Sequence, residues 1–238
     1  MTNRAPIFLA IDTSDLKTAQ KLAADVSPYF KGIKLGLEFF MRFGSDGVRS
    51  VLKAADHDTK FFLDLKFHDI PNTVFKSVQN TLDLKPDFVT VHAAGGTEML
   101  KAAVKAVENT KTKILAVTVL TSLDDADIKT ISGKTVQQTV LDYAAIAEKA
   151  GVHGLVCSPH ELKVLNQKLD SHLDLIVPGI RLHADNTDDQ KRIMTPIKAL
   201  ENGASYLVIG RAVTQSDQPA LVAKKIAHDI LEKETKVA

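Results

Sequence analysis

The sequence predicts an α/β protein with a (β/α)8 TIM-barrel fold. Short runs rich in Val, Ile, Leu and Phe recur along the 238 residues, and a longer amphipathic segment follows most of them. The runs are almost continuously apolar, which is typical of parallel strands covered on both faces. No linker or low-complexity tract interrupts the alternation, so we expect a single barrel domain spanning residues 1–238. A doubly wound open sheet is the alternative, but the first run lacks the Gly-rich turn of many such folds.

The predicted strands differ in length but share the same apolar character. The first three contain charged residues, whereas the last two have a Gly near the end and an Arg at the end or directly after it. They occupy residues 7–12, 32–37, 61–67, 87–93, 113–120, 154–158, 175–180 and 206–211.

Four segments between the runs have apolar residues at helical spacing. Thr13 or Ser14 is the candidate N-cap of the first. Gly151 ends the third in a C′ position, and Pro219 opens the last. These predicted helices occupy residues 13–26, 97–109, 135–151 and 219–233.

Two connections are longer than simple turns. Residues 121–135 follow the fifth predicted strand, and residues 181–192 follow the seventh. In a barrel, both connections lie at the C-terminal mouth, where active sites are built. Long polar loops in that place are candidates for lids that close over a ligand.

The composition argues against a nucleic-acid-binding protein and a membrane protein. Thirty basic residues face 29 acidic ones, so the formal charge of +1 gives no support to a broad nucleic-acid-binding surface. No segment offers the ~18 consecutive apolar residues of a membrane helix. The only cysteine, Cys157, fits a reducing compartment and is expected to be a buried apolar residue. The N-terminus carries no signal-peptide pattern, so we expect a cytoplasmic protein.

Charged residues interrupt three of the apolar runs. Asp64 and Lys66 are two residues apart and point to the same side of a regular strand. Asp12 ends the first run and Lys34 lies in the second. We expect these two lysines and two aspartates to converge at the barrel mouth, where their charges sum to zero without a metal. The alternatives are a catalytic array and a structural ion-pair network that plugs the barrel.

Asp69 lies beyond the end of the third run, just before Ile70 and Pro71. It can face solvent, cap the following helix or cross a subunit interface. The pattern alone favours the cap or the solvent.

The last two strands end in a way that suits phosphate. Pro178, Gly179 and Arg181 follow the seventh, and Gly210 and Arg211 follow the eighth. Barrels often bind phosphate there, because glycine allows close backbone approach and arginine presents a forked donor. Ordinary surface turns are the alternative.

The histidines suggest no zinc site, because no H-E-x-x-H or Cys/His spacing is present. His92 could line the pocket, but a satisfied core histidine is the favoured interpretation. No metal or cofactor is predicted.

With these residues in view, the whole chain resembles the orotidine 5′-phosphate decarboxylase family, in its bacterial form. The most specific match is DLKFHDIPNT at residues 64–73, which contains the family's Asp-x-Lys-x-x-Asp signature. Further matches follow in order along the chain: AIDTSD at Asp12, IKLG at Lys34, TVLTS at Thr121, VPGIR at Arg181, then Gln190, and IGR at Gly210 and Arg211.

The resemblance implies a role for each matched residue. Lys66 is the proton donor to C6 of the pyrimidine, and Lys34, Asp64 and Lys66 form a charged array. Asp12 and Lys34 hold the ribose hydroxyls. The remaining substrate contacts are Ile70, Thr73, Thr121, Pro178, Arg181, Gln190, Gly210 and Arg211, of which Gln190, Gly210 and Arg211 grip the phosphate.

The resemblance also implies the reaction and the assembly. Orotidine 5′-monophosphate loses CO₂ to give UMP, without metal or cofactor. The protein is a homodimer with active sites at the interface, to which Asp69, Ile70 and Thr73 are contributed in trans.

Two rival functions share the predicted fold. Sugar-phosphate decarboxylases and hexulose-phosphate synthases of the same superfamily use an Asp-x-Lys-x-x-Asp pattern with Mg²⁺, but the Ile-Pro-Asn-Thr continuation argues against them. A catalytically silent phosphosugar-binding barrel is the rival from another class, and the intact acid–lysine array argues against it.

Overall fold

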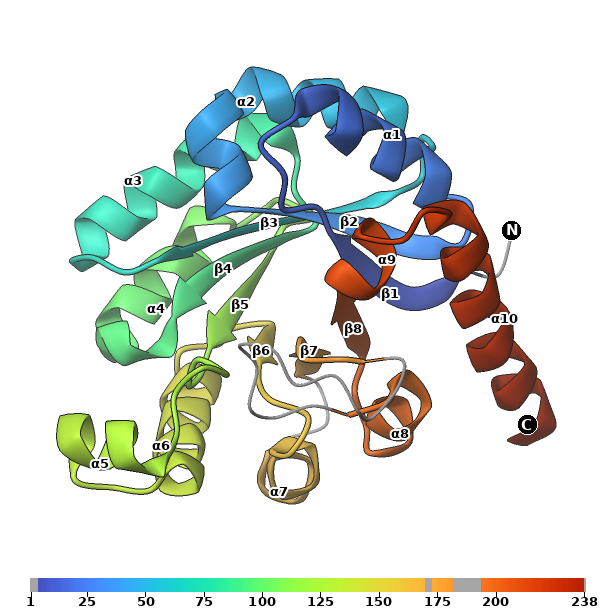
Figure 1. Cartoon of the computed structure of the whole chain (residues 1–238). Coiled ribbons are helices and arrows are strands. Elements are labelled where there is room, and N and C mark those ends of the chain that lie inside the picture. Colours follow the sequence, from blue (N-terminus) through green and yellow to red (C-terminus); the bar gives the residue numbers. More distant parts are fainter. Residues whose placement is uncertain (1–3, 170–172, 182–193, 238) are drawn as a thin grey trace. The chain divides into compact units, whose positions relative to one another are not determined.

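Eight parallel strands follow one another in chain order as a closed barrel (Figure 1), which confirms the predicted (β/α)8 fold. The structure is a computed structural model that describes residues 4–169, 173–181 and 194–237. The strands are β1 (Ala5–Ala10), β2 (Phe30–Gly36), β3 (Lys60–Phe67), β4 (Phe88–His92), β5 (Lys113–Val117), β6 (Gly154–Val156), β7 (Asp174–Val177) and β8 (Tyr206–Ile209).

Helices connect the strands, as the alternating pattern predicts. The short turns η1 (Leu82–Leu84) and η2 (Ala93–Gly95) flank β4. The helices of the described residues are α1 (Leu16–Val26), α2 (Leu37–Ala54), α3 (Pro71–Thr81), α4 (Gly96–Ala106), α5 (Asp125–Ser132), α6 (Val136–Lys149), α7 (Leu162–Lys168), α8 (Pro196–Glu201), α9 (Arg211–Thr214) and α10 (Pro219–Val237).

The chain comprises two compact units. One consists of residues 1–65 and 208–238, and the other of residues 66–207. The single domain expected for residues 1–238 stays a prediction, because nothing in this division tests it.

In the unit of residues 1–65 and 208–238, the strand register brings charged positions to the same level. Ala10 pairs with Lys34, and Gly36 pairs with Asp64. The interior of these strands is apolar, and the rings of Phe8 and Phe62 meet edge to face with centroids 5.7 Å apart. Helices α1 and α2 pack against each other, and α10 packs against α1 and β1 (Figure 1).

In the unit of residues 66–207, strands β4 to β8 pair in parallel. Thr90 pairs with Leu115, and Ile176 pairs with Tyr206. The strand residues of this unit are mostly buried, as expected where both faces of a parallel sheet are covered. Helices α3 and α4 pack together outside β4 (Figure 1).

The predicted helix ends are partly right. Gly151 follows α6 with φ of +76°, and Pro219 begins α10, as predicted. The expected cap of α1 is wrong, because Asp15 and not Thr13 or Ser14 accepts from the backbone N–H of Thr18. Thr13 accepts from the N–H of Asp15 instead, so its hydroxyl shapes the turn before the helix.

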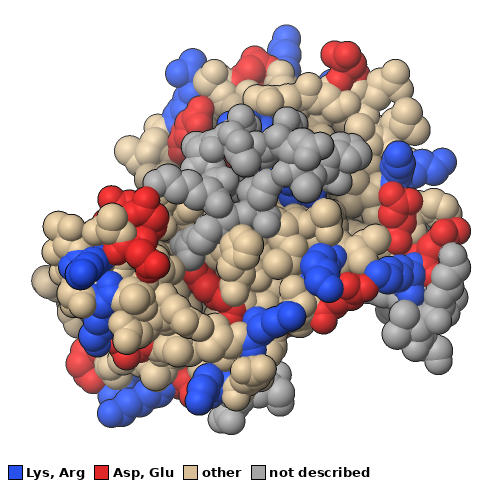
Figure 2. Space-filling view, turned by 60° about the horizontal axis from the view of Figure 1, so that its bottom comes forward, with Lys and Arg blue, Asp and Glu red and all other residues tan. Residues whose placement is uncertain are grey.

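Basic and acidic side chains are interspersed on the face shown in Figure 2. This mixture agrees with the near balance of 30 basic and 29 acidic residues. None of the helices in the described part of the chain is long and apolar enough to cross a membrane.

Gly32 gives a test of the packing between β1, β2 and β3. A Cβ at this position would meet the ring of Phe8 and lie 2.6 Å from the carbonyl oxygen of Lys60. We therefore expect Gly32→Ala to lower the free energy of unfolding by about 3 kcal/mol, as overpacking does in a tight core. Urea unfolding measures this difference. Adding Phe8→Leu should recover part of the loss, and an unchanged stability of Gly32→Ala would contradict the described packing.

Candidate active site

Three charged residues, one after β1, one in β2 and one in β3, form an ion-pair cluster. The Nζ of Lys34 lies 3.2 Å from Oδ2 of Asp64 and 3.7 Å from Oδ1 of Asp12. The side chains of Lys34 and Asp64 are each 10 % exposed, whereas that of Asp12 is 50 % exposed. The predicted convergence is therefore confirmed for Asp12, Lys34 and Asp64, and that of Lys66 with them stays a prediction. The cluster opens to solvent on the side of Asp12.

The cluster keeps Lys34 charged. Burial by itself lowers the pKa of this amine, but the carboxylates of Asp64 and Asp12 outweigh that effect and raise the pKa above its ordinary value of 10.5. Lys34 is therefore an ammonium at neutral pH, with donors available for hydroxyl groups of a ligand.

Gly36 belongs to this cluster, although the sequence analysis did not single it out. A Cβ at position 36 would lie 3.2 Å from Oδ1 of Asp12 and 3.3 Å from Nζ of Lys34. A side chain here would press on the ion pair, so the glycine leaves the room that the pair needs. The only sequence signal is its place two residues after a lysine that interrupts an apolar strand.

Lys66 departs from regular strand geometry. Its φ is +50°, in the left-handed region that residues with a Cβ rarely adopt. The side chain is half-buried, and the backbone N–H donates to the hydroxyl of Thr90 over 2.9 Å. The prediction that Asp64 and Lys66 point to the same side assumes regular strand geometry. A residue with the φ of Lys66 departs from that geometry, so the prediction loses its basis.

The residues after β3 face outward in this chain. Asp69, Ile70 and Thr73 are all exposed, with Ile70 at 67 %. One carboxylate oxygen of Asp69 accepts from the N–H of Ile70 over 2.7 Å. Helix α3 has no side-chain cap, so the interpretation of Asp69 as a helix cap is wrong. The trans contribution of these three residues stays a prediction.

The end of β7 presents an arginine with an unused donor. Gly179 has a φ of +79°, and Pro178 before it is half-buried. The Nη1 of Arg181 donates to the carbonyl of Ile180 over 3.3 Å. Its Nη2 is buried and has no hydrogen-bond partner among the residues that the structure describes. A buried guanidinium donor of this kind calls for an acceptor such as an anion.

The end of β8 leads directly into the short helix α9. Gly210 precedes the helix, and a Cβ at this position would meet Ala10 at an ordinary contact distance of 3.6 Å. The chain's own packing therefore does not require a glycine here. Arg211 is exposed at the start of α9, and the predicted site residue Gln190 lies outside the described residues.

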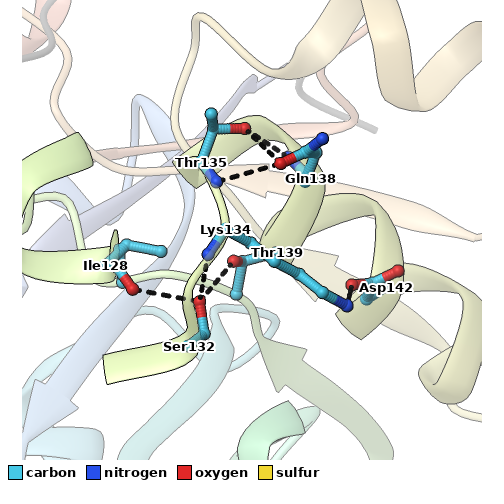
Figure 3. Close-up of polar contacts among 7 residues, drawn as sticks. All are labelled: Ile128, Ser132, Lys134, Thr135, Gln138, Thr139 and Asp142. Carbon is cyan, nitrogen blue, oxygen red and sulfur yellow. Dashed lines mark hydrogen bonds and ion pairs between the residues drawn. The ribbon is translucent and has the colours of Figure 1, made fainter. Parts of the chain in front are cut away.

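The connection at 121–135 is more ordered than the sequence analysis expected. Thr121 is half-buried at its start, and α5 occupies its middle. Asp124 and Thr135 each form a capping box, at the starts of α5 and α6. The Nζ of Lys134 lies 2.6 Å from Oδ2 of Asp142. Figure 3 shows this pair and the contact between Ser132 and Thr139 that joins the two helices. The connection predicted as a long loop thus contains a short helix with a capped N-terminus.

His92 and Cys157 complete the predicted set. The ring of His92 is half-buried and lies 5.4 Å from that of the exposed His68, so it is not a fully enclosed core residue. Cys157 is 1 % exposed and unbridged, as predicted. The described residues include no group of three or more His, Cys, Asp or Glu side chains arranged to hold a metal.

Comparisons with known proteins agree with the resemblance. The model of the "Orotidine 5′-phosphate decarboxylase / HUMPS family" matches residues 5–226. A protein named orotidine 5′-phosphate decarboxylase from Sphingopyxis alaskensis is 47 % identical over 93 % of this chain and 97 % of its own. Its counterpart from Rhodospirillum rubrum is 44 % identical over 95 % and 94 %. The crystal structure of the Lactobacillus acidophilus protein of that name matches with a TM-score of 0.79 and 31 % identity, over 96 % of this chain and 99 % of that one.

Replacing Lys34 with Met tests the ion-pair cluster. We expect the free energy of unfolding at pH 7 to fall by about 3 kcal/mol, because Asp64 loses a buried partner. The pKa of Lys34 is raised in the folded protein, so its contribution is fully present below pH 10.5 and is lost as the pH rises through the higher folded pKa. Urea unfolding of both proteins at several pH values measures this difference.

The control for this experiment is Lys21→Met. Lys21 forms an exposed pair with Asp25 on α1, so its loss should change stability by less than about 0.5 kcal/mol. Equal losses in the free energy of unfolding for the two substitutions would show that the Lys34 cluster stabilises the fold no more than an exposed ion pair does.

Proposed function

Because the chain belongs to the orotidine 5′-phosphate decarboxylase / HUMPS family, we propose that it converts orotidine 5′-monophosphate to UMP and CO₂ in pyrimidine biosynthesis. The observation that carries the proposal is the buried Lys34 held between Asp12 and Asp64, of which Asp64 precedes Lys66 by two residues on β3. A charge array of this kind suits a reaction that develops charge and recruits no electron sink. The alternative is a barrel that uses the same charges to bind a ligand and catalyses no reaction.

The chemistry requires a cation near C6 of the pyrimidine ring. When the carboxylate leaves as CO₂, its bonding electrons stay on C6 in an sp² orbital that the ring cannot delocalise. A fixed positive charge lowers the free energy of that state. We assign this role to Lys66, whose ammonium then transfers a proton to C6 and recovers one from solvent.

Two acids support this lysine in the proposed mechanism. Asp64 precedes it by two residues on β3, and its negative charge favours the protonated amine. Asp64 also disfavours the substrate carboxylate when the two lie close together. Asp69 of a second subunit completes the array, as the family resemblance implies.

We assign the ribose hydroxyls to Lys34 and Asp12. The raised pKa of Lys34 supports this assignment, since an ammonium donates to a hydroxyl that in turn donates to a carboxylate. The 50 % exposure of the Asp12 side chain leaves it accessible to a ligand. Thr73 of the partner assists there.

We assign the phosphate to Arg211, Gln190 and the backbone of Gly210, with Arg181 closing over it. Two observations support this assignment: the buried Nη2 of Arg181 has no hydrogen-bond partner within the described part of the chain, and packing does not require a glycine at 210. Phosphate lies far from the reacting carbon, so its binding energy aids the reaction by organising the site. Pro178 and Thr121 contact the pyrimidine end, and Ile70 contacts the substrate from the partner.

The homodimer is part of the same proposal. Ile70 is 67 % exposed, and a second copy of the chain would cover it in the proposed dimer. Asp69 and Thr73 are exposed beside it and would enter the partner's site. We also propose a cytoplasmic location, which the one reduced, buried cysteine supports.

The reaction itself is tested with protein treated with EDTA. Orotidine 5′-monophosphate is added, loss of its ultraviolet absorbance is followed, and the product is identified by chromatography. Conversion to UMP without added metal supports the proposal. Turnover only after Mg²⁺ is restored would favour the metal-dependent members of the superfamily, and tight binding without turnover would favour a silent binding protein.

Lys66→Ala tests the proton donor. We expect kcat to fall by at least about 10⁴-fold, because both charge stabilisation and proton transfer are lost, while the fold is retained. Steady-state kinetics and circular dichroism measure the two properties. Lys60→Ala, at the other end of β3, is the control and should keep kcat within about twofold. Substantial turnover by Lys66→Ala would refute the assignment.

Mixing two inactive variants tests the trans contribution of Asp69. Lys66→Ala and Asp69→Asn are each expected to be inactive, but a mixed dimer would contain one intact site. After unfolding and refolding together in equal amounts, about one quarter of the wild-type activity should return, since half of the dimers are mixed and each has one intact site. No recovery would place Asp69 in the site of its own subunit or outside the site.

A further inference from the structure

Lys66 is held in a backbone conformation that its own type disfavours. Three non-glycine residues of the described chain have positive φ: Lys66 at +50°, Lys85 at +51° and Asn109 at +64°. Lys85 is the C-cap of η1, where a left-handed residue is ordinary. Of the three, Lys66 alone lies within a strand, where the chain is normally extended.

Strain of this kind persists only where the surroundings enforce it. The backbone N–H of Lys66 donates to the Oγ1 of Thr90 over 2.9 Å. Thr90 is 0 % exposed in the middle of β4, and its position is fixed by pairing with Leu115 of β5. A buried hydroxyl on a rigid strand can hold a neighbouring peptide in one orientation, because releasing that N–H would leave it unsatisfied.

We propose that Thr90 is a positioning residue that holds the Leu65–Lys66 peptide so that Lys66 keeps its left-handed backbone and its amine keeps one direction. The hydroxyl acts on the backbone and does not need to touch the substrate. That Thr90 holds the backbone of Lys66 does not depend on the reaction. The effect of this hold on kcat rests on the proposed function. A proton donor on a flexible four-carbon chain depends on its backbone for direction, and small misplacement lowers kcat.

Thermal unfolding of variants at position 66 tests the conformation without any reaction. Alanine has a Cβ that is disfavoured in the left-handed region, whereas glycine has none. The melting temperature of Lys66→Gly should therefore be about 2–4 °C above that of Lys66→Ala. Lys85, with nearly the same φ, should show the same order. Lys31, an exposed residue of β2, should show the reverse, since glycine weakens a regular strand.

The same comparison in a Thr90→Val background tests the hydrogen bond. Valine keeps the shape of threonine but cannot accept, so the peptide is released and the advantage of glycine over alanine at position 66 should disappear. The advantage at Lys85 should persist in that background. A full advantage at position 66 despite Thr90→Val would overturn the proposal.

Kinetics of Thr90 variants test the consequence for catalysis. With Lys66 intact, Thr90→Val should lower kcat about 10- to 100-fold with little change in KM, and Thr90→Ser, which keeps the acceptor, should restore most of it. Thr112→Val is the matched control, because it removes another buried threonine hydroxyl, which donates to the carbonyl of Pro86 over 2.7 Å. It should destabilise the protein while leaving kcat unchanged.

The outcomes separate this inference from the proposed function. Equal kcat for Thr90→Val and wild type, or failure of Thr90→Ser to restore kcat, would overturn the positioning role. If the wild-type protein does not decarboxylate orotidine 5′-monophosphate, the proposed function fails, and the melting comparisons still support or overturn the conformational role of Thr90.

Discussion

The burial of positive charge at Lys34 constrains both the fold and the candidate site. An ammonium inside an apolar strand must be paired, and the partners come from the strands on either side, Asp12 after β1 and Asp64 in β3. The pairing matches the register, in which Ala10 meets Lys34 and Gly36 meets Asp64. A slip by one residue would turn the charges to the opposite face, so the ion pairs that prepare a ligand site also help to select the strand alignment.

At Lys34, the ion pairs of the proposed site also support folding. At Lys66, the proposed proton donor, the backbone conformation opposes folding. The ion pairs of Lys34 satisfy buried charges, whereas the left-handed backbone of Lys66 opposes the local preference of its residue type. The fold tolerates this conflict because β4 is rigid and supplies the hydroxyl of Thr90. A strained residue and a buried ion pair thus lie two residues apart on β3, a combination that agrees with the proposed role of this strand.

The sequence predicts the architecture and part of the site. Apolar periodicity identifies the strands and helices, and charges near strand ends predict the meeting of Asp12, Lys34 and Asp64. The φ of Lys66 could not be predicted, because tertiary contacts set it against the residue's own preference. Helix α5 was missed because short polar helices have little apolar periodicity and depend on caps such as Asp124. The trans roles of the residues after β3 need a second chain.

Stability and the proposed chemistry make opposite demands on the residue at position 66. Asparagine tolerates the left-handed region better than lysine does, and the genetic code separates the two residues by one nucleotide. A single nucleotide change to asparagine would therefore relax the backbone at position 66 and remove the amine. Under the proposed function, the chemistry of the amine opposes this change, whereas stability alone favours it. In a lineage that no longer needed the reaction, this codon would be among the first to change while the barrel around it survived.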